Sequence, residues 1–165
     1  ITFINIAKKL HMYEKQINFV VAGQIYKSQK KYYRLLKNLI KKYKISNVYF
    51  LNAFNDVRPF LKIIDIYVCS SNNESSPLAV WEAMAMKKPI VSTDVGDVSK
   101  FIKNGINGYL ANVSDSKGLA EGIEKLLKKP NLQKKFGAIS RKIVKNKLNL
   151  NLCSKLHLRA FYRIS

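Results

Sequence analysis

The sequence predicts an α/β fold in which a parallel, doubly wound sheet carries helices on both faces. Short apolar runs of strand length, such as residues 17–22 and 89–93, alternate with stretches whose apolar side chains recur at helical spacing, such as residues 27–44. Turn-forming residues separate these stretches, with a cluster of Asn and Gly at residues 104–108. We find no internal repeat and no linker in the 165 residues, a length that suits one domain.

Each element can be placed in order along the chain. Residues 1–14 begin it with a helical stripe, and Asp56 is expected to cap a short helix at residues 57–64. The expected strands are residues 17–22, 48–51, 66–70, 89–93 and 109–111. The expected helices are residues 1–14, 27–44, 57–64, 98–103, 116–128 and 132–146, with one more that begins at Pro77 and a last one that ends at Tyr162.

The composition excludes several classes of protein. Hydrophobic residues make up 47% of the chain, which is typical of a globular protein, and no apolar run approaches the roughly 18 residues that span a bilayer. Cys69 and Cys153 are too few and too far apart for a disulfide framework or a metal site, which indicates a reducing compartment such as the cytoplasm. No Ser-His-Asp or Cys-His nucleophile arrangement has support in the sequence.

The net charge is +20, and it is unevenly distributed. No Asp or Glu occurs between Glu14 and Asp56, and none follows Glu124. A Lys-rich solvated surface is the simpler interpretation. The other is attraction to anionic lipid, which would place the protein at the inner face of a membrane, or to nucleic acid.

Residues 74–82 organise the candidate site. In a parallel α/β fold, ligands bind beyond the carboxyl ends of the strands, and anions gather at helix N-termini. Ser76 before Pro77 predicts a helix start, because Pro suits the first helical position and Ser is a favoured cap. The free backbone donors of the first turn are then those of Leu78 and Ala79, which predicts a phosphate site.

Glu74 and Glu82 need another partner, because a carboxylate repels a phosphate. A carboxylate only accepts hydrogen bonds, so hydroxyl groups match it, at about 1.5–3 kcal/mol for each charged hydrogen bond. A phosphate beside several hydroxyls describes a sugar nucleotide. Taken singly, Glu74 could be a solvated loop acid and Glu82 a helix-surface acid. The hypothesis therefore rests on the joint order of strand, cap, proline and both carboxylates.

With these residues in view, the chain resembles the nucleotide-binding half of retaining glycosyltransferases of family 4, which have the GT-B fold. The resemblance rests on the E-x7-E spacing of residues 74–82, followed by EAMA, a strand that begins with Pro, and TDVG. It extends over nearly the whole chain, through FVVAG, NVYFLNAFNDV, NGINGYL and KLLKKPNLQKKFG.

The resemblance implies a site that works without a metal or another cofactor. Glu74 would be the catalytic residue that holds hydroxyls of the transferred sugar, and Glu82 would hold the ribose hydroxyls. Backbone groups near Phe54 would hold the base. Gly23 would allow close approach to the ligand, although a plain turn explains it equally well. The donor-binding residues would be Glu74, Ser75, Ser76, Leu78, Ala79, Glu82, Phe54 and Gly23.

The resemblance also implies parts that this chain lacks. Enzymes of this fold hold donor and acceptor on facing domains, so the acceptor domain would be absent. The first strand of the Rossmann-like nucleotide-binding domain would be absent too, with the basic pair that follows it. Its loss would leave a gap in the sheet or force its neighbours to pair directly. The start at Ile1, without a Met, fits a piece of a longer protein.

Three interpretations of function follow. The first is the donor-binding half of a retaining glycosyltransferase that moves a sugar from a nucleoside-diphosphate sugar to a glycan or lipid acceptor, as in polysaccharide biosynthesis. The second keeps the fold but makes the protein a nucleotide-sugar epimerase. The third is a basic module that binds nucleic acid or a membrane, although no groove-reading motif or zinc site supports nucleic acid.

Overall fold

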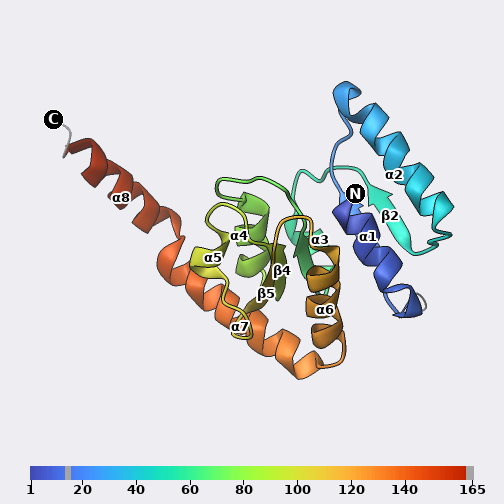
Figure 1. Ribbon diagram of the computed structural model, residues 1–165. Coiled ribbons are helices and arrows are strands. Elements are labelled where there is room, and N and C mark those ends of the chain that lie inside the picture. The colour runs from blue at the N-terminus through green and yellow to red at the C-terminus, as the bar shows by residue number, and fades with distance from the viewer. Residues whose placement is uncertain (14–15, 163–165) are drawn as a thin grey trace.

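The computed structural model describes residues 1–13 and 16–162 and has the predicted α/β architecture (Figure 1). The expected helix at residues 1–14 is confirmed for Thr2–Lys9; a 3-10 turn follows at His11–Tyr13, and Glu14 lies outside the described residues. The strands are β1 (Phe19–Ala22), β2 (Val48–Leu51), β3 (Tyr67–Cys69), β4 (Ile90–Thr93) and β5 (Gly108–Ala111). The helices are α1 (Thr2–Lys9), α2 (Lys30–Lys42), α3 (Arg58–Ile63), α4 (Leu78–Ala85), α5 (Val98–Phe101), α6 (Ser116–Leu127), α7 (Pro130–Lys147) and α8 (Leu150–Tyr162), with short 3-10 turns at His11–Tyr13 and Lys27–Gln29.

The five strands form two parallel sheets rather than one. β1 pairs with β2, with Phe19 opposite Val48. β4 lies between β3 and β5, with Val91 opposite Val68 and Tyr109. No described residue pairs β1 with β3, so each sheet ends in an unpaired strand edge.

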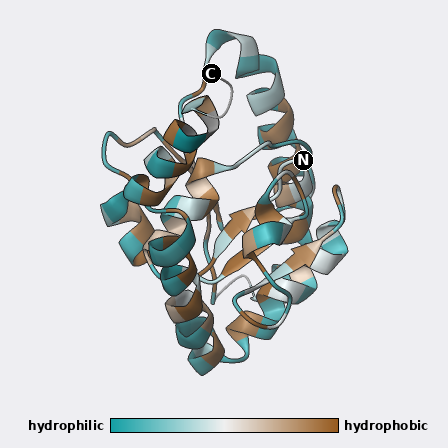
Figure 2. Ribbon diagram, turned by 90° about the vertical axis from the view of Figure 1, so that its left-hand side faces the viewer, coloured by the Kyte–Doolittle hydropathy of each residue, from teal (hydrophilic) through white to brown (hydrophobic). Residues whose placement is uncertain are grey.

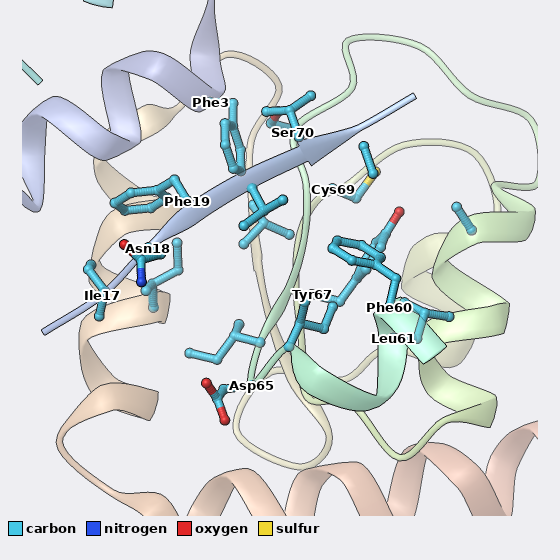
Figure 3. A pocket seen from close by; sticks show the side chains of 18 of the residues that line it. Phe3, Ile17, Asn18, Phe19, Phe60, Leu61, Asp65, Tyr67, Cys69 and Ser70 are labelled. Carbon is cyan, nitrogen blue, oxygen red and sulfur yellow. The ribbon is translucent and has the colours of Figure 1, made fainter. Parts of the chain in front are cut away.

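The two unpaired edges face a shared cavity of about 1200 Å³. Side chains of β1 and β3 line it together, with Phe3 and Phe19 on one side and Phe60 and Tyr67 on the other (Figure 3). A doubly wound sheet has the strand order 3-2-1-4-5-6, and the observed order β2-β1, then β3-β4-β5, matches it with the first strand left out. A missing first strand was expected either to leave a gap or to force its neighbours to pair directly. The structure has the gap.

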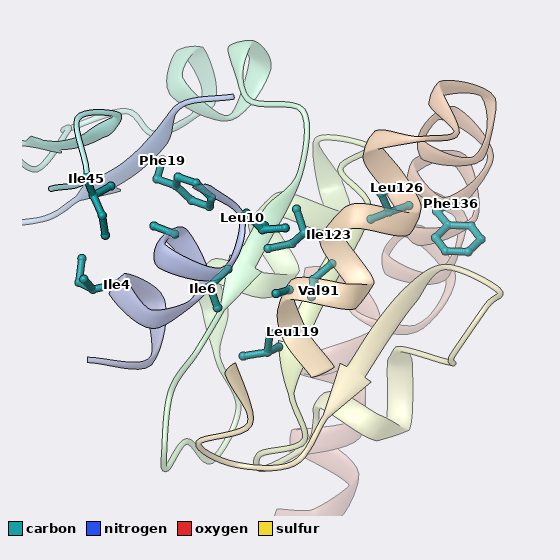
Figure 4. Packing of buried hydrophobic residues seen from close by; sticks show 12 residues of the cluster. Ile4, Ile6, Leu10, Phe19, Ile45, Val91, Leu119, Ile123, Leu126 and Phe136 are labelled. Carbon is teal, nitrogen blue, oxygen red and sulfur yellow. The ribbon is translucent and has the colours of Figure 1, made fainter. Parts of the chain in front are cut away.

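Helices cover both faces of the three-stranded sheet, as predicted. One buried cluster joins α1 to α6 and contacts β1 and β4, through Ile4, Ile6, Leu10, Phe19, Val91, Leu119 and Ile123 (Figure 4). The other packs α3, α4 and α5 against β3 and β4, through Leu61, Cys69, Val80, Met84, Ile90 and Val98. Hydropathy colouring shows the apolar strands enclosed by helices whose outer sides are polar (Figure 2). The α1–α6 contact thus holds the two sheets together across the gap.

The start of α3 differs from the sequence prediction. Asp56 was expected to cap α3, but the cap position is Val57. The Asp56 carboxylate still accepts the Arg58 backbone N–H at 3.0 Å and pairs with the Arg58 guanidinium at 2.8 Å. At the other end of the chain, α8 extends away from the sheets (Figure 1), and Leu150 and Phe161 are exposed on it. Within the described residues, no helix has the length and apolar character needed to cross a bilayer.

Filling the gap with a strand should stabilise the chain. An apolar extended segment of six residues, fused ahead of Ile1 through a short turn, could pair with both open edges, and each buried backbone group that gains a partner avoids a cost of about 1–3 kcal/mol. A net gain of about 3 kcal/mol raises Tm by roughly 6–12 °C for a protein of this size. Calorimetric Tm measures this, with a Gly/Ser segment of equal length as the control. Equal Tm values for the two fusions would show that the gap does not accept a strand.

Candidate functional site

The site lies where the chain leaves β3 and enters α4. β3 ends at Cys69, and residues 70–77 pass over the carboxyl edge of the sheet before α4 begins. The neighbouring strand β4 ends at Thr93, at the same edge, because the two strands run parallel. Ligands of parallel α/β folds bind at such edges. The structure therefore places the E-x7-E stretch at the expected end of the sheet.

The start of α4 corrects the prediction for Ser76. Pro77 is the cap residue, with an extended conformation (φ −71°, ψ 99°), so the helix begins one residue later than expected. The Ser76 hydroxyl accepts a hydrogen bond from the Trp81 indole N–H at 3.1 Å instead of capping the helix. Trp81 is only 8% exposed, and a buried indole N–H needs an acceptor. Ser76 thus anchors the loop to α4 through Trp81.

The first turn of α4 presents free backbone donors, as predicted. Val80 and Trp81 donate their backbone N–H groups to the Pro77 carbonyl, at 3.0 and 3.4 Å. The N–H groups of Leu78 and Ala79 donate to no acceptor among the described residues. Two free amides at the positive end of a helix dipole are the groups with which helix N-termini bind anions.

A chain of hydrogen bonds connects β4 to the Glu74 carboxylate. The Ser71 hydroxyl donates to Oε1 of Glu74 at 2.9 Å. The Thr93 hydroxyl, at the end of β4, donates to the Ser71 carbonyl at 2.7 Å. Thr93 is fully buried, so its position is set by the sheet itself. Sequence analysis missed both Ser71 and Thr93, because these partners are 22 residues apart in the chain.

Gly96, in the turn after β4, also holds the loop of residues 70–77 in place. Its backbone has φ of +51°, which favours glycine, and a Cβ there would collide with the carbonyl oxygens of Glu74 and Ser75. The next residue, Asp97, donates its backbone N–H to the Ser75 carbonyl at 2.9 Å. The TDVG motif therefore holds the loop that carries Glu74. A glycine in the turn directly after a buried strand was the sequence signal for this contact.

Glu74, Ala79 and Glu82 line the same cavity, and this cavity is continuous with the gap between β1 and β3. Glu82 lies one turn into α4 and is exposed. Burial raises the pKa of Tyr67 above its usual range, and the negative charges of Cys69, Glu82 and Glu74 raise it further. The two predicted carboxylates thus lie close enough to the half-buried Tyr67 phenol to affect its pKa. Ser75, Ser76 and Leu78 do not line the cavity, and Leu78 is 74% exposed.

Phe54 and Gly23 lie outside this cavity. The Phe54 ring stacks on Phe60, with 5.2 Å between ring centroids, and Phe60 lines the cavity. Gly23 lines a second cavity of about 180 Å³ between the end of the β1–β2 sheet and α2. A Cβ at Gly23 would meet open space, so neither backbone conformation nor crowding requires a glycine there.

No group of three or more His, Cys, Asp and Glu side chains in residues 1–13 and 16–162 is arranged to hold a metal ion.

Comparisons with known proteins identify the family of this chain. Residues 2–143 match the model of the family described as glycosyl transferases group 1. The chain is 35% identical over 111 residues to the N-acetyl-alpha-D-glucosaminyl L-malate synthase of Bacillus anthracis, a match that covers 67% of this chain and 28% of that protein. It is 34% identical over 97 residues to the putative glycosyltransferase EpsD of Bacillus subtilis, covering 59% of this chain and 26% of EpsD. The chain thus spans less than a third of each of these relatives.

Solved structures show the same fold. A glycosyltransferase from Rickettsia africae superposes with a TM-score of 0.86 at 23% identity, covering 98% of this chain and 44% of that one. HepE from Anabaena, solved in complex with UDP, superposes with a TM-score of 0.89 at 18% identity, covering 96% of this chain and 44% of HepE. Together with the family match over most of its length, these similarities show that the chain belongs to the glycosyl transferases group 1 family.

Proposed function

We propose that this chain is the donor-binding part of a retaining glycosyltransferase that uses a nucleoside-diphosphate sugar. The observation that carries the proposal is the arrangement at the amino end of α4. There the Glu74 and Glu82 carboxylates line one cavity with Ala79, whose amide is free among the described residues. Such a site offers hydrogen-bond donors for a phosphate beside hydrogen-bond acceptors for hydroxyl groups. A sugar nucleotide requires both.

The diphosphate of the donor would bind at the first turn of α4. The free amides of Leu78 and Ala79 donate hydrogen bonds, and the helix dipole stabilises negative charge there. In this proposal, backbone dipoles take the role that a divalent cation has in many phosphate sites, so the reaction needs no metal. The leaving phosphate, held at this turn, would help to deprotonate the acceptor hydroxyl while the sugar is transferred with retained configuration.

The two carboxylates would bind different parts of the donor. Glu82 follows the amides by one turn of helix, and we assign it to the ribose hydroxyls. Glu74 precedes the amides, on the loop at the carboxyl edge of the sheet, and we assign it to hydroxyls of the transferred sugar. The base would lie near Phe54 and the end of β2.

The acceptor is a glycan or a lipid-linked glycan in this proposal. Similar proteins include a capsular polysaccharide biosynthesis glycosyltransferase of Staphylococcus aureus and a diphospho-undecaprenol N-acetylgalactosaminyltransferase of Campylobacter jejuni. HepE has also been solved with UDP-glucose. Because the chain spans 44% of HepE, the acceptor would be held by residues beyond this chain.

Replacing Glu82 tests the ribose assignment. In the full-length protein, Glu82→Ala should weaken binding of the sugar nucleotide about 10- to 150-fold, the equivalent of about 1.5–3 kcal/mol for a lost charged hydrogen bond. Glu121→Ala removes an exposed carboxylate of α6 and is the matched control, with unchanged affinity expected. Isothermal calorimetry against UDP-, GDP- and ADP-sugars gives the dissociation constants. Equal affinities of the two variants for the preferred donor would contradict the ribose role.

Replacing Glu74 tests the sugar assignment. Glu74→Gln keeps the size of the side chain but removes its charge, so turnover and binding of the intact sugar nucleotide should fall at least tenfold. Binding of the bare nucleoside diphosphate should change less than twofold, because it lacks the sugar. The ratio of the two dissociation constants is the measurement. Equal losses of affinity for both ligands would show that Glu74 binds the nucleotide and not the sugar.

A further inference from the structure

Helix α2 carries a stripe of positive charge on its outer side. Residues spaced three or four apart share one face of a helix, and such spacing joins Lys30, Arg34, Lys37 and Lys41. All four are exposed, and no residue of α2 is buried. The inward side is apolar, where Leu36, Leu39, Ile40 and Tyr43 pack against the cluster around α1. The whole polar face of α2 therefore points to solvent as a row of cations.

Nothing acidic lies close in sequence to neutralise this row. The chain has no Asp or Glu from residue 15 to residue 55. Within residues 1–13 and 16–162, the ion pairs lie elsewhere, at Asp56–Arg58, Asp97–Lys100 and Glu124–Lys128. Lys37 contacts two aromatic rings instead, with its ammonium 5.0 Å from the centroid of the Phe50 ring and 5.6 Å from that of the Tyr33 ring. A solvated row of this kind attracts a polyanion.

Exposed apolar side chains near the basic face favour one kind of polyanion. Leu35 is 43% exposed, four residues after Lys31 and seven before Lys42, so it shares a side of α2 with two further exposed cations. Ile25 and Tyr26, just before the helix, are 41% and 58% exposed. Partly exposed aromatic and aliphatic groups beside cations suit a lipid surface, where the headgroups meet the charges and the acyl boundary accepts the apolar groups. Nucleic acid phosphates offer no such boundary to the aliphatic side chains.

We propose that the outer face of α2, defined by Lys30, Arg34, Lys37 and Lys41, binds the surface of an anionic lipid bilayer. Each cation near such a surface strengthens binding about fivefold, and the attraction is screened within roughly 8 Å at physiological salt. Four cations in one row therefore suffice for reversible binding at low ionic strength. This contact is independent of the donor site.

Vesicle sedimentation of the full-length protein tests this face. The vesicles contain either phosphatidylcholine alone or phosphatidylcholine with 30% phosphatidylglycerol. The test variant is K30Q/R34Q/K37Q/K41Q, and the matched control is K134Q/K135Q/K142Q/K145Q, which removes four exposed lysines from α7. Unchanged circular dichroism and Tm establish that both variants fold.

We expect binding of the unmodified protein to the anionic vesicles only, with release as salt rises. The α2 variant should bind at least a hundredfold more weakly, and the α7 variant less than tenfold more weakly. Equal losses of vesicle binding in the two variants would show that only the net charge matters, and would overturn the proposal. So would an absence of binding at low salt, or tighter binding to single-stranded RNA than to the anionic vesicles.

A second inference rests on the proposed function and concerns how Glu74 is oriented. Glu74 is exposed on a loop, so its side chain would otherwise sample several rotamers. The Ser71 hydroxyl donates to one carboxylate oxygen, and the buried Thr93 hydroxyl holds the Ser71 carbonyl. We infer that Ser71 is a positioning residue for Glu74, which leaves the second carboxylate oxygen for a substrate hydroxyl.

A double-mutant cycle in the full-length enzyme tests the role of Ser71. S71A should lower kcat about tenfold and leave affinity for the nucleoside diphosphate within twofold, while S71T should keep most activity because it retains the hydroxyl. In an E74Q background, S71A should change kcat less than twofold. If the two substitutions lowered kcat independently, so that their fold-losses multiplied in the double variant, the inference would be overturned. Loss of diphosphate binding in S71A would overturn it too. A normal kcat in E74Q alone would instead refute the role of Glu74 itself.

Discussion

The contact between the end of β4 and the loop after β3 positions the rest of the site. Thr93 is buried in the three-stranded sheet and holds Ser71, while Gly96 and Asp97 pack against the backbone of Glu74 and Ser75. These contacts fix the path of residues 70–77, and that path sets both the direction of Glu74 and the point where α4 begins. The rigid sheet thereby orients a polar loop that has little apolar contact of its own.

The gap between β1 and β3 is the second constraint, because the cavity of the site opens into it. Two parallel edges with free backbone groups face each other there, and unpaired buried groups are costly. The α1–α6 cluster spans the gap and holds the two sheets together. The geometry of the donor cavity therefore depends on what lies between β1 and β3, as much as on the residues that line its mouth.

The sequence predicted the elements well because their signals are local. Apolar runs marked the five strands, and the bounds predicted for residues 48–51 are those of β2. The cap predicted for α4 was wrong. Pro77 occupies the cap position, and the Ser76 hydroxyl accepts a hydrogen bond from the Trp81 indole N–H instead. Ser71 and Thr93 could not be predicted, because their contact joins the end of β4 to the loop after β3, 22 residues earlier in the chain. The interrupted sheet followed only from the resemblance to a family, as periodicity says nothing about strand order.

The most direct test of the account is a crystal structure of the full-length protein with its preferred nucleoside diphosphate. The account predicts phosphate oxygens within about 3.2 Å of the Leu78 and Ala79 backbone nitrogens, the range of an N–H···O hydrogen bond. It also predicts that the ribose hydroxyls contact the Glu82 carboxylate. A diphosphate bound elsewhere, or held by a divalent cation on Glu74 and Glu82, would contradict it.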